Sequence, residues 1–173
     1  MQIIFLSNWL TILSFIIIWP MMQVLISMIG NWIPDKYFNA DSFWYRIHRW
    51  EYGGRFYEKV LRIKLWKRWL PDGAKAFKVG FAKGELKETD EAYLKAFIAE
   101  TCRAEFVHTI QILPFWVFGL WSPPFVIWIM LGYALLANLP CIIAQRYNRP
   151  RLKKLYTALY LKNGDIGGEC SET

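Results

Sequence analysis

Charged side chains are missing from two long stretches of this 173-residue chain. No Asp, Glu, Lys or Arg occurs before Asp35, and none occurs between His108 and Arg146. Each stretch is longer than the roughly 20 apolar residues that an α-helix needs to cross a bilayer. The composition is also apolar for a soluble domain, with 55% hydrophobic residues. The sequence therefore predicts an all-α integral membrane protein, with residues 1–173 forming a single membrane domain.

Cysteine and histidine are scarce, and the motifs of many enzyme classes are absent. Cys102, Cys141 and Cys170 show no paired spacing, which argues against a disulfide framework and against a zinc site. The sequence has neither a Gly-rich phosphate loop nor a nucleophile elbow. The two histidines, His48 and His108, form no Cys/His pair. We therefore expect no bound cofactor and no metal.

The first uncharged stretch, residues 3–29, is predicted to be a retained membrane span. A secretory signal peptide would begin with basic residues and end at a small-residue cleavage site. This N-terminus has no Lys or Arg, and the stretch is followed by Gly30-Asn31-Trp32-Ile33-Pro34. A cleaved signal sequence is the alternative.

The second uncharged stretch is divided by Ser122-Pro123-Pro124, a strong helix breaker. It predicts a hairpin of two further spans, over residues 104–121 and 125–145. About three transmembrane helices would result. The alternative is one true span followed by a re-entrant hairpin.

The positive charge is confined to two regions of the sequence. All 21 lysines and arginines lie within residues 36–103 or from Arg146 onward. By the positive-inside rule, the N-terminus and the 122–124 turn face outside, whereas the C-terminus is cytosolic. Basic residues that alternate with Trp, Tyr and Phe beside spans are typical of a surface on lipid headgroups. We expect membrane lipid as a partner, and no nucleic acid.

Two amphipathic segments are predicted on the cytosolic side. Residues 34–103 are expected to be cytosolic or interfacial. Residues 42–70 within them alternate aromatic and basic side chains at roughly helical spacing, interrupted at Gly53-Gly54. They predict a helix lying in the membrane interface, or an ordinary amphipathic helix packed on the spans. Asn148-Arg149-Pro150 is expected to end the last span. Residues 150–162 would then form an interfacial tail helix.

The densest group of ionisable residues lies where a helix would enter the membrane. Glu100, Arg103 and His108 form one polar stripe on an ideal helix. Ionisable groups at membrane depth usually face a bundle interior or a wet cavity, so the stripe is a candidate site. A simple ion pair between Glu100 and Arg103 is the alternative. Glu105-x-x-His108 matches half of a di-metal carboxylate motif, but the other half is absent.

A second polar group lies at the end of the last uncharged stretch. Arginines with amide neighbours could hold a phosphate or a carboxylate through paired hydrogen bonds. The alternatives are a basic anchor on anionic lipid and, for the amide within the span, a helix–helix contact. The members of this group are Asn138, Gln145, Arg146, Asn148, Arg149 and Arg151.

These motifs resemble those of the glycosyl-4,4'-diaponeurosporenoate acyltransferase family, bacterial membrane enzymes that complete staphyloxanthin-type carotenoids. The resemblance covers nearly the whole chain in order, and the stretch from Gln145 to Leu152 is its most specific part. The other matching stretches are Ile33–Phe38, Glu51 with Gly54-Arg55-Phe56, Trp66-Lys67, Pro71-Asp72-Gly73, Glu100–Glu105 with His108, Leu113-Pro114 and Asn138-Leu139-Pro140.

The resemblance implies an acyltransferase of the bacterial cell membrane. It would esterify the sugar C6-hydroxyl of a glycosylated carotenoid acid with a fatty acyl chain. Its partners would be the amphiphilic glycosylated carotenoid, an acyl donor such as acyl-CoA, and membrane lipid. The resemblance assigns no catalytic residue. The alternatives are a non-catalytic carotenoid- or lipid-binding membrane subunit, and an acyltransferase for another glycolipid.

For the chemistry we predict His108 as the general base on the sugar hydroxyl. Glu100 or Glu105 would orient the imidazole. Substrate binding is assigned to the remaining polar groups of both stretches, with the arginines on donor phosphates or a lipid headgroup and an amide on the developing oxyanion. These residues are Arg103, Asn138, Gln145, Arg146, Asn148, Arg149 and Arg151.

Overall fold

The computed structural model describes residues 2–70 and 91–161, and every regular element within these ranges is helical. The chain divides into two compact units. The first unit is Met1–Pro34 with Arg103–Ile142, and the second unit is Asp35–Cys102 with Ile143–Thr173. The single membrane domain stays a prediction. The motif Pro71-Asp72-Gly73 lies outside the described residues.

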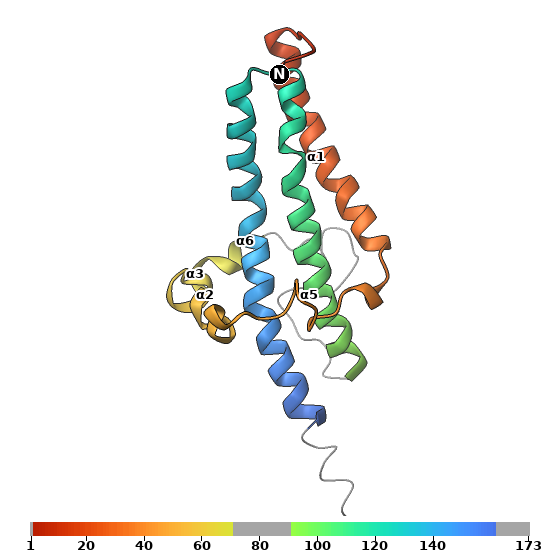
Figure 1. The fold of residues 1–173 in the computed structure, drawn as a ribbon, viewed down its shortest axis with the longest axis vertical. Helices are drawn as coiled ribbons and strands as arrows, with labels where there is room; N and C mark the ends of the chain where they lie inside the picture. Colours follow the sequence, from red (N-terminus) through yellow and green to blue (C-terminus); the bar gives the residue numbers. More distant parts are fainter. Residues whose placement is uncertain (1, 71–90, 162–173) are drawn as a thin grey trace, which may run out of the picture. The chain divides into compact units, whose positions relative to one another are not determined.

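The first unit consists of three helical segments. Helix α1 (Asn8–Trp32) is followed in this unit by the end of α5 (Glu91–Ile112), by η4 (Leu113–Leu120) and by the start of α6 (Pro124–Tyr156). Figure 1 shows that the chain direction reverses between α1 and α5 and again between α5 and α6. The N-terminal residues reach the turn between η4 and α6, where the Ile3 amide donates to the Leu120 carbonyl at 2.7 Å.

The core of the first unit is aromatic. Trp19 of α1 packs with Phe118, Trp121, Met130 and Ala134. The Trp121 indole nitrogen donates to the Ser14 hydroxyl at 2.8 Å, which satisfies its one polar group. Most other apolar side chains of α1 are exposed.

Two glutamines join α1 to α5 in the first unit. The Gln23 side-chain nitrogen donates to the Gln111 backbone carbonyl at 3.2 Å, and the Gln111 side-chain nitrogen donates to the Gln23 backbone carbonyl at 2.9 Å. The Gln111 amide also donates to the Ser27 hydroxyl at 2.9 Å. The buried Gln111 side chain is therefore fully engaged as a donor.

Within the described residues, two helices are long and apolar enough to cross a membrane. They are Asn8–Trp32 and Pro124–Tyr160, identified by length and composition. The predicted span 104–121 is not one α-helix, because α5 ends at Ile112 and the tighter 3₁₀ helix η4 follows. Pro114 lacks the amide hydrogen that would continue the α-helical ladder. The number of three spans stays a prediction.

The second unit contains the aromatic and basic segment, and a single helix over residues 42–70 is wrong. The segment folds into short pieces because the backbone takes left-handed φ values at Tyr52, Gly53, Gly54 and Arg62. Its core combines Tyr57 and Ile63 with Ala144 and Tyr147 of α6. The pieces are η2 (Arg49–Gly54), α2 (Arg55–Lys59), α3 (Ile63–Trp66) and η3 (Lys67–Trp69), and the short helix η1 (Asp35–Tyr37) precedes the segment.

The predicted break at Asn148-Arg149-Pro150 is also wrong. Helix α6 continues to Tyr156 and passes into a π-helical turn, η5 (Thr157–Leu161), so residues 150–162 do not begin a separate helix. Gly54 lacks the side chain that would crowd the Pro150 ring, since a Cβ there would lie 3.2 Å from Pro150 Cγ. An interfacial position of this tail stays a prediction.

Candidate functional site

The predicted site residues are divided between the two units. The first unit contains Arg103, Glu105, His108 and Asn138. The second unit contains Glu100, Gln145, Arg146, Asn148, Arg149 and Arg151.

In the first unit, His108 of α5 and Asn138 of α6 are joined by a hydrogen bond. His108 Nδ1 lies 3.0 Å from Asn138 Oδ1. Asn138 is buried, whereas His108 is half-buried. Asn138 Nδ2 donates to the Ala134 carbonyl at 3.0 Å, one helical turn earlier.

This pair fixes the tautomer of the imidazole. A carbonyl oxygen only accepts hydrogen bonds, so the amide end bonded to Ala134 must be the nitrogen. The Asn138 oxygen then faces His108, and Nδ1 must carry the hydrogen that it accepts. In the neutral ring the lone pair is left on Nε2. The arrangement can therefore accept a proton at Nε2 while Asn138 holds the ring in place.

The other residues of this group have structural contacts. Arg103 Nη2 donates to the Ile33 carbonyl just beyond α1 at 3.1 Å. The Glu105 side chain is buried, and the Glu105 backbone carbonyl accepts from the Thr109 hydroxyl at 2.8 Å. The sequence predicts a carboxylate as the partner of His108, but at Nδ1 the partner is the Asn138 amide.

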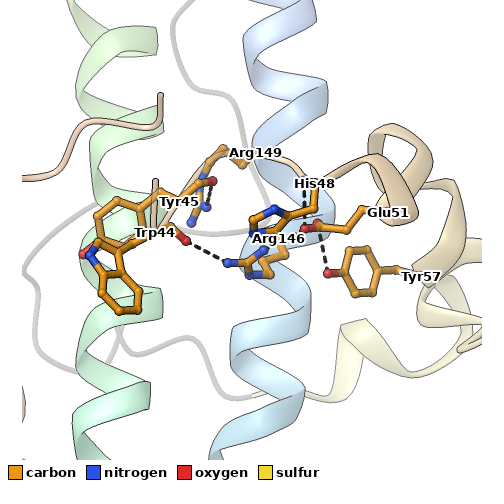
Figure 2. Close-up of polar contacts among 7 residues, drawn as sticks. All are labelled: Trp44, Tyr45, His48, Glu51, Tyr57, Arg146 and Arg149. Atoms are coloured by element: carbon orange, nitrogen blue, oxygen red, sulfur yellow. Dashed lines mark hydrogen bonds and ion pairs between the residues drawn. The ribbon is translucent and has the colours of Figure 1, made fainter. Parts of the chain in front are cut away.

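In the second unit, Arg146 of α6 is paired with the buried carboxylate of Glu51 (Figure 2). Arg146 Nη1 donates to Glu51 Oε1 at 2.7 Å, and Nη2 donates to the Trp44 carbonyl at 2.8 Å. Glu51 also accepts from the Tyr57 hydroxyl at 3.0 Å and from the His48 backbone amide at 3.2 Å. The carboxylate thus ties η2 and α2 to α6.

Burial and the adjacent Glu51 carboxylate raise the pKa of the Tyr57 phenol above its usual value. Tyr57 therefore remains a neutral hydrogen-bond donor to Glu51 at neutral pH. Together with Arg146 it satisfies the fully buried carboxylate, as buried charges require.

Arg149 is completely buried, and its guanidinium donates to side-chain and backbone groups of the second unit. Its Nε donates to the Thr101 hydroxyl at 3.0 Å, and Nη2 donates to the Thr101 carbonyl at 2.9 Å. Nη1 donates to the Tyr45 carbonyl at 2.7 Å (Figure 2). Arg149 and Arg146 therefore both anchor the Trp44-Tyr45 backbone on α6.

Arg151 and Asn148 lie on α6 beside Lys67, which is not among the predicted site residues. Lys67 Nζ donates to Asn148 Oδ1 at 2.8 Å. Arg151 donates to Glu58 Oε2 at 2.7 Å and to the Tyr147 carbonyl at 2.8 Å. Burial, followed by the nearby Arg151, lowers the pKa of Lys67.

The remaining predicted residues contribute less to a site. Gln145 is buried, and its Nε2 has no hydrogen-bond partner among residues 2–70 and 91–161. Glu100 is half-buried on α5. Within those same ranges, no group of three His, Cys, Asp or Glu side chains could hold a metal ion.

Four residues of these clusters carry no strong sequence signal. Glu51 and Lys67 occur in the stretches that carry the family resemblance, which is the one signal that could have selected them. Thr101 becomes important through Arg149, which lies 48 residues away in the sequence. Tyr57 donates to Glu51, only six residues away, but no sequence motif identifies that pair.

Comparison with known proteins gives one consistent family. A family model described as glycosyl-4,4'-diaponeurosporenoate acyltransferase matches residues 41–158. A protein of that name from Staphylococcus aureus strain MRSA252 is 37% identical over 141 residues, covering 82% of this chain and 85% of the relative. The same-named protein of strain Newman is 36% identical over 144 residues, covering 83% and 87%. No solved structure matches the chain.

Proposed function

Because the chain belongs to the glycosyl-4,4'-diaponeurosporenoate acyltransferase family and is an acyltransferase, we propose that it esterifies a sugar hydroxyl of a glycosylated carotenoid with a fatty acyl chain. Family membership favours this enzyme over a non-catalytic lipid-binding subunit. The structural observation that supports the chemistry is the bond of His108 Nδ1 to the Asn138 side-chain oxygen.

In this proposal His108 is the general base. Its Nε2 takes the proton of the sugar hydroxyl as the hydroxyl oxygen attacks the carbonyl carbon of an acyl thioester, for which acyl-CoA is the proposed donor. The C–S bond then breaks, and the imidazolium returns the proton to the leaving thiolate. Asn138 accepts from Nδ1–H throughout and keeps the ring oriented, as an asparagine does in Cys-His-Asn sites.

The acceptor suits a membrane site, because its polyene is apolar and its sugar is polar. We propose that α1 and α6 cross the bacterial cell membrane, with the N-terminus outside and the C-terminus cytosolic. His108 directly precedes the second uncharged stretch, and we propose that a sugar at headgroup depth meets its imidazole there, whereas Asn138 reaches it from within the predicted span 125–145. Thiol labelling of intact cells tests the orientation. A cysteine at Gln2 should react with an impermeant reagent, and one at Lys154 should not.

The decisive assay uses purified full-length protein in lipid nanodiscs with a glycosylated carotenoid acid and a long-chain acyl-CoA. We expect the acyl ester by mass spectrometry. His108→Gln should lower the rate by about 10²–10⁴-fold, the usual contribution of general-base catalysis. His48→Gln is the matched control, because it removes the other histidine.

Two outcomes would change the proposal. Ester formation that persists in His108→Gln would leave the enzyme in place but remove His108 as its base. No ester with the carotenoid glycoside, but an ester with another glycolipid, would change the acceptor.

A further inference from the structure

One cluster in the second unit contains more positive than negative charge. Lys64 and Arg151 both pair with the carboxylate of Glu58. Lys67 and Arg151 both lie over the ring of the buried Tyr147, at 5.2 Å and 3.5 Å from its centroid. The cluster therefore contains three cations and one carboxylate, and it keeps an excess of positive charge.

Lys67 is the least compensated of these cations. Its ammonium is half-buried and donates to the Asn148 amide oxygen. Among residues 2–70 and 91–161 no carboxylate pairs with it, although Arg151 is close enough to lower its pKa together with burial. An ammonium in this setting is stabilised by an anion that comes into contact with it.

The donors around Lys67 are arranged for such an anion. Asn148 turns its oxygen toward Lys67, so its amide nitrogen carries two further hydrogens that can donate. The Arg151 side chain is 40% exposed. Its two terminal nitrogens donate to the Tyr147 carbonyl and to Glu58, and each carries a second hydrogen that can donate. Gly54 allows this placement, because a Cβ there would lie 3.3 Å from Arg151 Nη1.

We propose that Lys67, Asn148 and Arg151 form a binding site for a phosphate group, carried either by a coenzyme A donor or by a phospholipid headgroup. A phosphate matches the excess positive charge, and its oxygens can accept from the ammonium, the amide and the guanidinium together. The two candidate sources rest on the proposed acyl transfer, whereas the binding site itself does not. Arg146 and Arg149 are engaged with Glu51, Thr101 and the backbone, which leaves this cluster as the more accessible cationic surface of α6.

The test measures binding without turnover. Full-length protein in phosphatidylcholine nanodiscs is titrated with coenzyme A by calorimetry, and phosphatidylglycerol retention is measured separately by native mass spectrometry. Lys67→Gln should lower the affinity for one of these ligands by about tenfold or more, as expected for the loss of a charge-assisted hydrogen bond. Loss in the first arm identifies the soluble donor, and loss in the second identifies the headgroup.

Two further variants control for folding and for net charge. Asn148→Asp is nearly isosteric and supplies Lys67 with a carboxylate, so it should keep the fold and weaken phosphate binding to a similar extent. Lys36→Gln removes an exposed lysine that also lies 5.2 Å from a tyrosine ring, and binding should stay within about twofold. Unchanged affinity for both ligands in Lys67→Gln and Asn148→Asp would overturn the proposal.

This result is separable from that of the proposed reaction. Neither arm needs the carotenoid or an acyl chain, so His108→Gln protein should bind both ligands as the wild type does. Normal ligand binding without catalysis in His108→Gln would implicate the base. Normal ligand binding with catalysis in Lys67→Gln and Asn148→Asp would contradict the phosphate site and leave the proposed reaction in place.

Discussion

Arg149 is bonded twice to Thr101, through Nε to the hydroxyl at 3.0 Å and through Nη2 to the carbonyl at 2.9 Å. Its third bond, from Nη1, reaches the Tyr45 carbonyl. One fully buried side chain thereby joins α6, α5 and the loop before η2 within the second unit. A residue expected to bind substrate thus has a clear structural role.

Replacing Arg149 by Met should destabilise the protein without a matching loss of substrate affinity. The Met side chain cannot donate, so the Thr101 and Tyr45 acceptors lose their partner inside the unit. We expect the free energy of unfolding to fall by about 2–4 kcal/mol, given about 1–3 kcal/mol for each buried group left unpaired. Arg46→Met, at an exposed position, should change it by less than about 0.5 kcal/mol. Thermal unfolding in detergent compares the two, and equal melting temperatures would contradict this role.

The pKa of Tyr57 predicts how stability depends on alkaline pH. Burial and Glu51 raise this pKa above the unfolded value of about 10. The protonated phenol therefore contributes stability that is fully present below about pH 10 and is lost as pH rises through the folded pKa. Unfolding measured from pH 9 to 11.5 should show a steeper loss in the wild type than in Tyr57→Phe. Parallel curves would mean that the phenol titrates as in the unfolded chain.

Asn138→Leu tests the orientation of His108. Leucine has a similar size but cannot accept from Nδ1–H, so the imidazole is free to rotate or to adopt the other tautomer. We expect kcat to fall by about 10–100-fold with little change in KM, in the range typical of groups that orient a functional histidine. A Leu variant with an altered KM and a normal kcat would instead assign Asn138 to substrate binding. Helical content by circular dichroism checks that α6 is intact.

Adjacent glycines offer a matched test of the turn before α2. Gly54 has φ +90°, and a Cβ there would crowd Pro150 and Arg151. Gly53 has φ +65°, and a Cβ there would meet nothing within 4 Å. We expect Gly54→Ala to lower the free energy of unfolding by about 1–3 kcal/mol, because crowding adds to the backbone strain. Gly53→Ala should lower it by about 1 kcal/mol through strain alone. Chemical unfolding of both variants measures the difference, and equal losses would mean that α6 yields to the added methyl group.

The long apolar helices were predictable, whereas the short ones were not. Uncharged stretches locate α1 and most of α6 because apolar length is a local property of the sequence. Pro150 misleads, since its ring fits against Gly54 and its neighbour Arg149 is held by distant groups. The interruption of residues 42–70 at Gly53-Gly54 was visible in the sequence, whereas the positive φ of Arg62 has no counterpart in composition.

The sequence selects His108, Asn138 and the arginines of α6 as candidates, but it does not predict which residues they pair with. His108 and Asn138 were both selected because polar groups in apolar helices need partners. Their mutual contact depends on packing between α5 and α6, because the two residues are 30 positions apart in the sequence. Arg146 was selected for its charge, but the sequence does not predict that it forms an ion pair with the buried Glu51.

The exchange of hydrogen bonds between Gln23 and Gln111 fixes how far α1 can slide along its neighbour. An apolar helix of Ile, Leu and Met offers many similar positions, and shape alone separates them weakly. A slip by one turn, about 5.4 Å, would strand both amides in apolar surroundings, at a cost of several kcal/mol. Ser14, bonded to Trp121, provides a second fixed point nine residues away. Two such points set both the depth and the rotation of α1, so its insertion during assembly has one acceptable end state.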